Sequence, residues 1–188
     1  MNDHALETIL KQLKYYRHLG HSTLLQVPEA ELFRSEGDGG NSIAVVVKHL
    51  WGNMMSRFTD FLTSDGEKEW REREKEFDND LPSKEEVVAK FNEGWDCVFG
   101  AIEPLTGADL ETIVYIRNEG HTVYEAILRQ SNHYAYHTGQ MVFMGKIIMG
   151  DDWKSLSIPR GQSAAFNAKK FSQEKHKAHF TDTVTNKD

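Results

Sequence analysis

Two histidines four residues apart, His133 and His137, are the pair of side chains in this sequence best suited to chemistry. They lie in a segment from about residue 122 to 150 whose apolar residues recur at helical spacing, so both imidazoles point the same way. Gln130 and Met141 share their stripe, which we expect to face a core. A buried polar pair needs partners, and neutral imidazole binds Zn, Ni, Cu and Fe. The spacing predicts part of a metal site, but it also arises by chance, so a third ligand is needed.

Four segments with helical periodicity must position this pair. They cover about residues 3–26, 42–62, 83–103 and 122–150. Asn41 or Ser42 can cap the second segment, and capping boxes open the third at Ser83 and the fourth at Thr122. A turn-rich loop over residues 34–41 separates the first two segments. The sequence therefore predicts an all-α protein built from four amphipathic helices.

The connections between the helices are less regular. Residues 64–82 are dominated by charged side chains, which we interpret as a solvated face on which Trp70 packs locally. A connection of this length allows the chain to cross the bundle, so the second and third helices need not be antiparallel neighbours. Residues 108–120 contain a β-prone run and are either extended or a loop. Residues 169–188 are polar, and we expect a mobile tail there.

The composition restricts the partners and the compartment. The 188 residues are enough for one domain with a substantial core. Asp and Glu outnumber Lys and Arg by 29 to 22, so there is no general basic excess and no nucleic-acid partner is expected. Cys97 is the single cysteine, which excludes an intrachain disulfide. It lies within the third predicted helix, and because nothing in the sequence indicates a depressed thiol pKa, we interpret it as a small buried filler rather than a nucleophile. With neither a signal-peptide pattern nor a membrane-spanning apolar run, we expect a soluble, cytoplasmic protein without a membrane partner.

The order of the motifs resembles a known family. A Gly/Asn-rich loop precedes Ser42-Ile43, then come Lys48-His49-Leu50 and finally His133-x-x-x-His137-x-x-Gln140. Over about residues 3–168 the chain resembles the DinB-like (DinB/YfiT-like metalloenzyme) superfamily, and most closely its DUF1572 branch. The resemblance implies an up-down-down-up four-helix bundle, which we assign to residues 1–168. It also implies one divalent ion held by a histidine of the second helix and two of the last.

In this sequence, the positions that match the family's three metal ligands are His49, His133 and His137. His49 lies at the flank of its apolar stripe, and its position alone favours a rim histidine that is hydrogen-bonded to a neighbour over a metal ligand. Di-iron carboxylate bundles require Glu-x-x-His motifs, and the chain contains none. The zincin string His-Glu-x-x-His is also absent. We therefore expect one divalent ion, Zn or Ni first and Fe or Mn as alternatives.

Three protein ligands leave a metal position open, as catalytic sites require. The resemblance points to a thiol S-transferase that uses a low-molecular-weight thiol, or to a related hydrolase, with a small-molecule substrate. Asn53, Gln130 and Gln140 lie on the faces nearest the histidines and could orient ligands or substrate, and Arg129 could meet a substrate carboxylate. Spacing places no carboxylate beside the histidines, so no general base is predicted. The alternative is a non-catalytic metal-binding or stress-associated bundle in which the metal or a dimer interface is structural.

A homodimer is also expected. The resemblance implies frequent dimers, and the helices carry more large apolar residues than one small core needs. The residues behind this argument are Trp51, Phe61, Trp95 and Phe99. If they lie on the surface, they would mark the interface.

Overall fold

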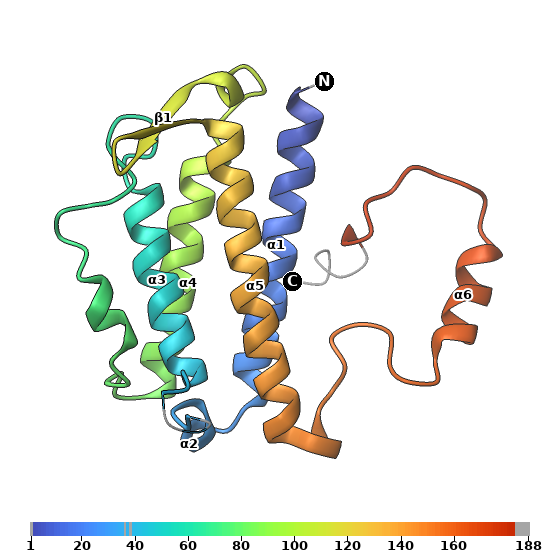
Figure 1. Cartoon of the computed structure of the whole chain (residues 1–188). Coiled ribbons are helices and arrows are strands. Elements are labelled where there is room, and N and C mark those ends of the chain that lie inside the picture. Colours follow the sequence, from blue (N-terminus) through green and yellow to red (C-terminus); the bar gives the residue numbers. More distant parts are fainter. Residues whose placement is uncertain (1, 36, 38, 183–188) are drawn as a thin grey trace.

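Four long helices lie side by side in the computed structural model, which describes residues 2–35, 37 and 39–182 (Figure 1). They are α1 (Asn2–Gln26), α3 (Ile43–Phe58), α4 (Lys84–Ile102) and α5 (Val123–Met149). The shorter elements are α2 (Glu29–Leu32), α6 (Ser163–Phe171), the 3-10 helices η1 (Arg73–Phe77), η2 (Asp109–Glu111) and η3 (Gly150–Asp152), and the strands β1 (Ile113–Ile116) and β2 (Glu119–Thr122). Of the predicted first loop, Glu36 and Asp38 lie outside the described residues, as do residues 183–188 of the predicted tail.

The long helices form a closed ring of contacts. α1 packs against α4 and α5, and α3 packs against the same two helices. α1 and α5 run in one direction and α3 and α4 in the other, because the connection after α3 returns along the length of the helices before α4 begins (Figure 1). At Gly94 of α4 an added Cβ would lie 2.9 Å from Met54 Sδ of α3, so glycine allows these two helices to approach closely.

The predicted helix starts are confirmed by their caps. Ser42 Oγ accepts a hydrogen bond from the Val45 amide, and Ser83 Oγ accepts one from the Glu86 amide. At Ser83 this is one half of the predicted capping box. Thr122 and Glu125 form a complete capping box, in which each side chain bonds the other's backbone N–H. α3 ends at Phe58, four residues earlier than predicted, because Asp60 adopts φ 49° and turns the chain.

Residues 108–120, which the sequence predicts to be either extended or a loop, contribute most of a β-hairpin. β1 and β2 pair antiparallel, with Ile116 opposite Glu119 as the last pair before the turn. Arg117 and Asn118 make a two-residue turn with φ of 57° and 62°, the left-handed geometry that suits a tight hairpin. Each of their amides donates a 2.8 Å hydrogen bond to the carboxylate of Asp65. The hairpin is therefore attached to the connection that follows α3.

The expectation of a solvated face over residues 64–82 is wrong for the charged groups nearest α3. Glu76 is only 5% exposed, and the Arg71 side chain is 3% exposed. Each neutralises the other, which offsets the cost of removing both charges from water. Trp70 does not pack locally as expected, since 56% of it is exposed. The connection over residues 59–83, called the crossover below, thus buries a charge pair and exposes an indole.

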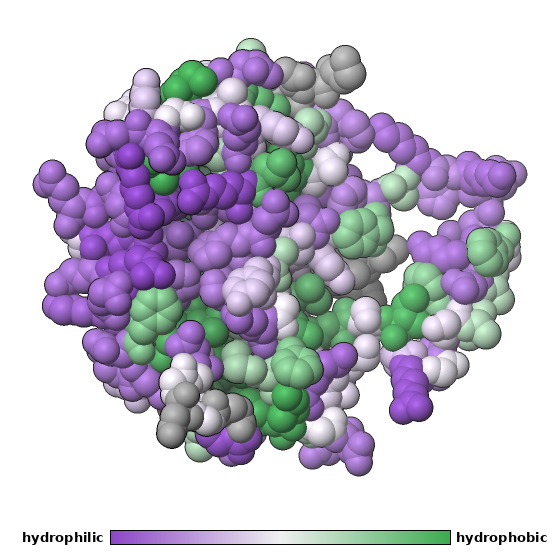
Figure 2. Space-filling view, viewed as in Figure 1, coloured by the Kyte–Doolittle hydropathy of each residue, from purple (hydrophilic) through white to green (hydrophobic). Residues whose placement is uncertain are grey.

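Three of the four aromatic residues that suggested a dimer interface lie in the core. Phe61, Trp95 and Phe99 are buried, and Trp51 is half-buried. Four packed helices with a hairpin across one end need more large side chains than the sequence suggested, so this argument for a homodimer fails. The surface shown in Figure 2 is mostly hydrophilic over the crossover, and apolar residues appear over the C-terminal half of α5, where Phe143 is 64% and Ile147 54% exposed. The homodimer stays a prediction.

Lys154 is still hydrogen-bonded to Gln26 of α1, and the chain after it extends away from the four long helices (Figure 1). The exposed helix α6 was not predicted from the sequence. Near the end of the described chain, the ring of Phe180 packs edge-on against Tyr15 of α1, and Asp182 forms a 3.1 Å ion pair with Lys11. Within the described residues, each helix is too short or too polar to cross a membrane.

Candidate metal centre

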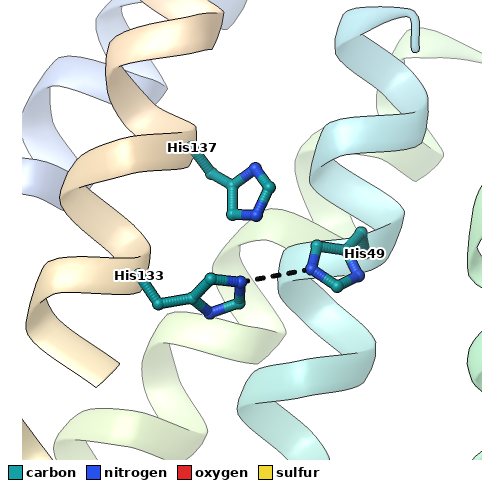
Figure 3. A group of neighbouring side chains, drawn as sticks. All are labelled: His49, His133 and His137. Carbon is teal, nitrogen blue, oxygen red and sulfur yellow. Dashed lines mark hydrogen bonds between the residues drawn. The ribbon is translucent and has the colours of Figure 1, made fainter. Parts of the chain in front are cut away.

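Three histidines from two helices point at one another between α3 and α5 (Figure 3). His49 comes from α3, and His133 and His137 come from α5. One potential ligand atom from each lies within 4.8 Å of the other two. His49 Nε2 and His133 Nε2 are 3.2 Å apart, and the ring centroids of His133 and His137 are 4.6 Å apart. The three side chains predicted from the sequence are thus close enough to bind one metal ion.

The spacing between these nitrogens suits a shared ion. Two ligands of a tetrahedral zinc ion, each about 2.05 Å from it, are about 3.3 Å apart. The observed 3.2 Å between His49 Nε2 and His133 Nε2 matches that value. The remaining separations between the ligand atoms are all within 4.8 Å. The donor set therefore fits a divalent ion that accepts nitrogen ligands.

The histidines of α5 are held in the neutral form that metals require. Burial, with the charges of His137, His49 and Arg71 nearby, lowers the pKa of His133 to about 3. Burial also lowers the pKa of His137, although its hydrogen bond to Gln140 opposes the shift. At neutral pH, these two α5 imidazoles therefore carry no charge that must be lost before a metal ion binds.

Hydrogen bonds to Nδ1 select the tautomer of two histidines. His137 Nδ1 lies 2.8 Å from Gln140 Oε1, and His49 Nδ1 lies 2.9 Å from Glu76 Oε2. Both acceptors are oxygens, so each Nδ1 carries the proton and donates it, and each Nε2 keeps a lone pair. In this way the side chains around the site direct the Nε2 lone pairs of His49 and His137 to the centre.

No residue spacing in the sequence predicts that Glu76 lies beside the histidines. It lies 27 residues after His49, in η1 of the crossover. Both of its oxygens also accept hydrogen bonds from Arg71, from Nε at 2.7 Å and from Nη2 at 3.0 Å. Burial alone would raise the pKa of Glu76, but His49 and Arg71 outweigh burial and the pKa lies below its usual value. A carboxylate is therefore present beside the histidines, contrary to the expectation from spacing.

Of the four predicted helper residues, the structure brings Gln140 to the histidines through its contact with His137. Asn53 is buried and accepts a 3.3 Å hydrogen bond from the hydroxyl of Tyr134. Gln130 is buried at a small cavity beside the hairpin, which it lines with Arg57 and Ile116 among others. Arg129 is exposed on α5. Gln140 alone among them has a contact that can orient a metal ligand.

Aromatic rings flank two of the histidines. The ring of Phe77 stacks on His49 with centroids 5.2 Å apart, and the ring of Tyr136 meets His137 edge-on at 4.9 Å. Tyr136 is 63% exposed and Phe77 is 36% exposed, while His133 and His137 are half-buried. The site is therefore partly open to solvent and bordered by apolar ring surfaces.

Cys97 has no part in this arrangement. It is half-buried in α4 and lies 3.8 Å from the hydroxyl of Thr59. Burial raises the pKa of its thiol, which disfavours the reactive thiolate. Its packing agrees with the interpretation as a small filler.

A family model described as "Protein of unknown function (DUF1572)" matches residues 1–162. The chain belongs to this DUF1572 family. No curated protein and no solved structure matches it. In this DUF1572 protein the matched range includes His49, Glu76, His133 and His137 and ends one residue before α6. The family description assigns no activity.

Proposed function

We propose that this protein is a divalent-metal-dependent enzyme whose ion is held by His49, His133 and His137. The observation that carries the proposal is the convergence of three imidazoles within 4.8 Å, two of them only half-buried. Three protein ligands are typical of catalytic sites, which keep a position open for water or substrate. The order of the helices and histidines also resembles the DinB-like superfamily, and we infer that the four long helices are its up-down-down-up bundle.

Thiol transfer suits the surrounding groups better than hydrolysis. A bound divalent ion would supply a Lewis acid that lowers the pKa of a coordinated thiol or water. Hydrolysis also benefits from a general base, but Glu76 already bonds His49 and Arg71 with both of its oxygens. A thiolate is a nucleophile without further deprotonation. We therefore infer a thiol S-transferase that acts with a low-molecular-weight thiol, with Zn or Ni as the first candidate ions.

The chain's own residues would each have a limited part in this reaction. Gln140 holds His137 and Glu76 holds His49 with their Nε2 atoms toward the centre. Phe77 and Tyr136 border the site with ring surfaces that disfavour competing water. An electrophile with an apolar portion is the substrate class that this border accepts.

A conjugation assay tests the proposal. Protein purified without a nickel column and loaded with zinc should accelerate the reaction of bacillithiol, or a similar small thiol, with an electrophile such as 1-chloro-2,4-dinitrobenzene. We expect His133→Ala to lower the rate by roughly 100-fold or more, since it removes a ligand. His176→Ala, a histidine change in the exposed region after α6, is the matched control and should keep the rate. A loaded protein with no rate above the uncatalysed reaction would contradict the enzyme proposal for the thiols tested.

The second candidate is a structural metal in a non-catalytic protein. The link from His49 through Glu76 to Arg71 favours it, because an ion at the histidines would then tie α3, α5 and the crossover together. In that case a chelator lowers the melting temperature substantially and there is no thiol-dependent rate to lose. Melting and conjugation measured on the same chelator-treated sample separate the two candidates.

A further inference from the structure

The imidazole of His49 is fixed by two neighbouring residues of the crossover. Glu76 bonds the ring edge at Nδ1, and Phe77 stacks on the ring face with an interplanar angle of 24°. Both residues belong to η1, which packs on α3. The ring of His49 is therefore oriented by a segment of the chain that contributes no predicted metal ligand.

The surface of α3 is shaped to receive Glu76. A Cβ at Gly52, three residues after His49, would lie 2.3 Å from Glu76 Oε1 and 2.7 Å from its carboxyl carbon. Any side chain at position 52 would thus displace the carboxylate. Glycine within a helix lowers the stability of that helix. The space that the Glu76 carboxylate needs accounts for a glycine at this position.

Arg71 binds the carboxylate of Glu76 as well. Its guanidinium binds Glu76 through two nitrogens in a forked geometry, and the side chains of the pair are 3% and 6% exposed. Such a pair fixes the carboxylate at one position, because the planar fork permits little rotation. The carboxylate is then presented to His49 in one orientation rather than sampling several.

We propose that Glu76, held by Arg71, is the positioning residue of the metal ligand His49, so that metal affinity depends on the docked crossover segment 71–77. The carboxylate retains the proton on Nδ1, aims Nε2 at the centre, and increases the electron density that Nε2 can donate. The coupling is reciprocal, so an ion bound at His49 also stabilises the docked segment. This inference rests on the proposed function only in requiring that an ion binds to the three histidines.

Zinc affinity of the Glu76→Gln variant tests this role. The amide keeps the size of the side chain but removes the charge, and we expect zinc binding, measured by competition with a chromophoric chelator, to weaken about 10- to 100-fold. The d–d absorption of a cobalt-substituted sample should change as well, because the orientation of one ligand changes. Glu74→Gln is the matched control, as Glu74 lies in the same 3-10 helix with its side chain 89% exposed, and we expect its affinity to stay within about twofold of the original.

A double variant separates positioning from a general loss of stability. Glu76→Gln alone leaves Arg71 buried without its full partner, whereas Arg71→Met with Glu76→Gln removes both charges and should restore the melting temperature of the metal-free protein. We expect the affinity to stay low in the double variant. Recovery of affinity together with stability, or unchanged affinity and cobalt spectrum in folded Glu76→Gln, would overturn the proposal.

Hydrogen exchange provides the reciprocal measurement. Zinc should slow amide exchange over residues 71–77 in the unsubstituted protein, and this protection should be lost in Glu76→Gln. Equal protection in both proteins would contradict the coupling. Failure of the metal site itself has a different signature: the unsubstituted protein would then bind zinc no more tightly than His133→Ala does.

Discussion

The two sides of the candidate metal centre are constructed differently. On α5, the two histidines and Gln140 lie within eight consecutive positions of one helix, and Gln140 bonds His137 across three residues. On the other side, His49 of α3 depends on Glu76, which is 27 residues away in the crossover. Local spacing thus creates the first side, and packing of a distant segment creates the second. We expect the first to need only an intact helix and the second to need the whole tertiary structure.

Removal of a ligand from either side should have the largest effect. We expect His133→Ala and His49→Ala each to abolish stoichiometric zinc, since two remaining imidazoles cannot hold the ion alone against a competing chelator. Elemental analysis after mild chelator treatment measures this, with circular dichroism to verify that the helices remain. Stoichiometric zinc in either variant would show that the two sides do not form one site.

Loosening the crossover, on which the second side depends, should lower the stability of the protein. Glu67 Oε2 accepts hydrogen bonds at 3.0 Å from both Arg57 and Arg117 and lies 3.5 Å from Arg71. Glu67→Gln should therefore lower the free energy of unfolding at pH 7 by about 2 kcal/mol, a typical value for hydrogen bonds to a charged group. Glu69→Gln, an exposed position in the same segment, is the control and should cost little. Urea unfolding measures both.

The effect of Glu67→Gln should depend on pH. Burial alone would raise the pKa of Glu67, but the arginines outweigh burial and the pKa is lowered. A lowered carboxyl pKa adds stability above the ordinary value of about 4.3, and that stability is lost as the pH falls through the folded-state pKa. The two proteins should therefore converge in stability in acid. A difference that persists unchanged in acid would mean that Glu67 acts through its shape rather than its charge.

The smallest effect is expected from the local partner on α5. Gln140→Leu removes the acceptor of His137 Nδ1, and we expect zinc affinity to fall about tenfold, at the lower end for such partners because the amide is neutral. Asn132→Leu, an exposed amide on the same helix, is the control. Chelator competition gives both values. A loss larger than that of Glu76→Gln would reverse the comparison between the two sides.

Much of the helical structure could be predicted because its causes are local. Ser42, Ser83 and Thr122 cap helices through hydrogen bonds to residues three positions ahead, so sequence spacing alone identifies them. The geometry of His133 and His137 is local for the same reason. The sequence does not decide between a hairpin and a loop, because a β-prone run forms a strand only if a partner strand and a turn form as well. Here the turn is stabilised by Asp65, which lies 52 residues away in the sequence.

The sequence by itself determined the helix starts and the face shared by the α5 histidines. Its resemblance to a known family implied the third histidine, and the DUF1572 branch of that resemblance is confirmed. Tertiary structure decided where the crossover lies, and with it the burial of Arg71 and Glu76 and the exposure of Trp70. The physical reason is that a charged side chain is stable in solvent or, once paired and hydrogen-bonded, in the interior. Composition cannot distinguish these outcomes, because the pairing partner is known only when the chain has folded.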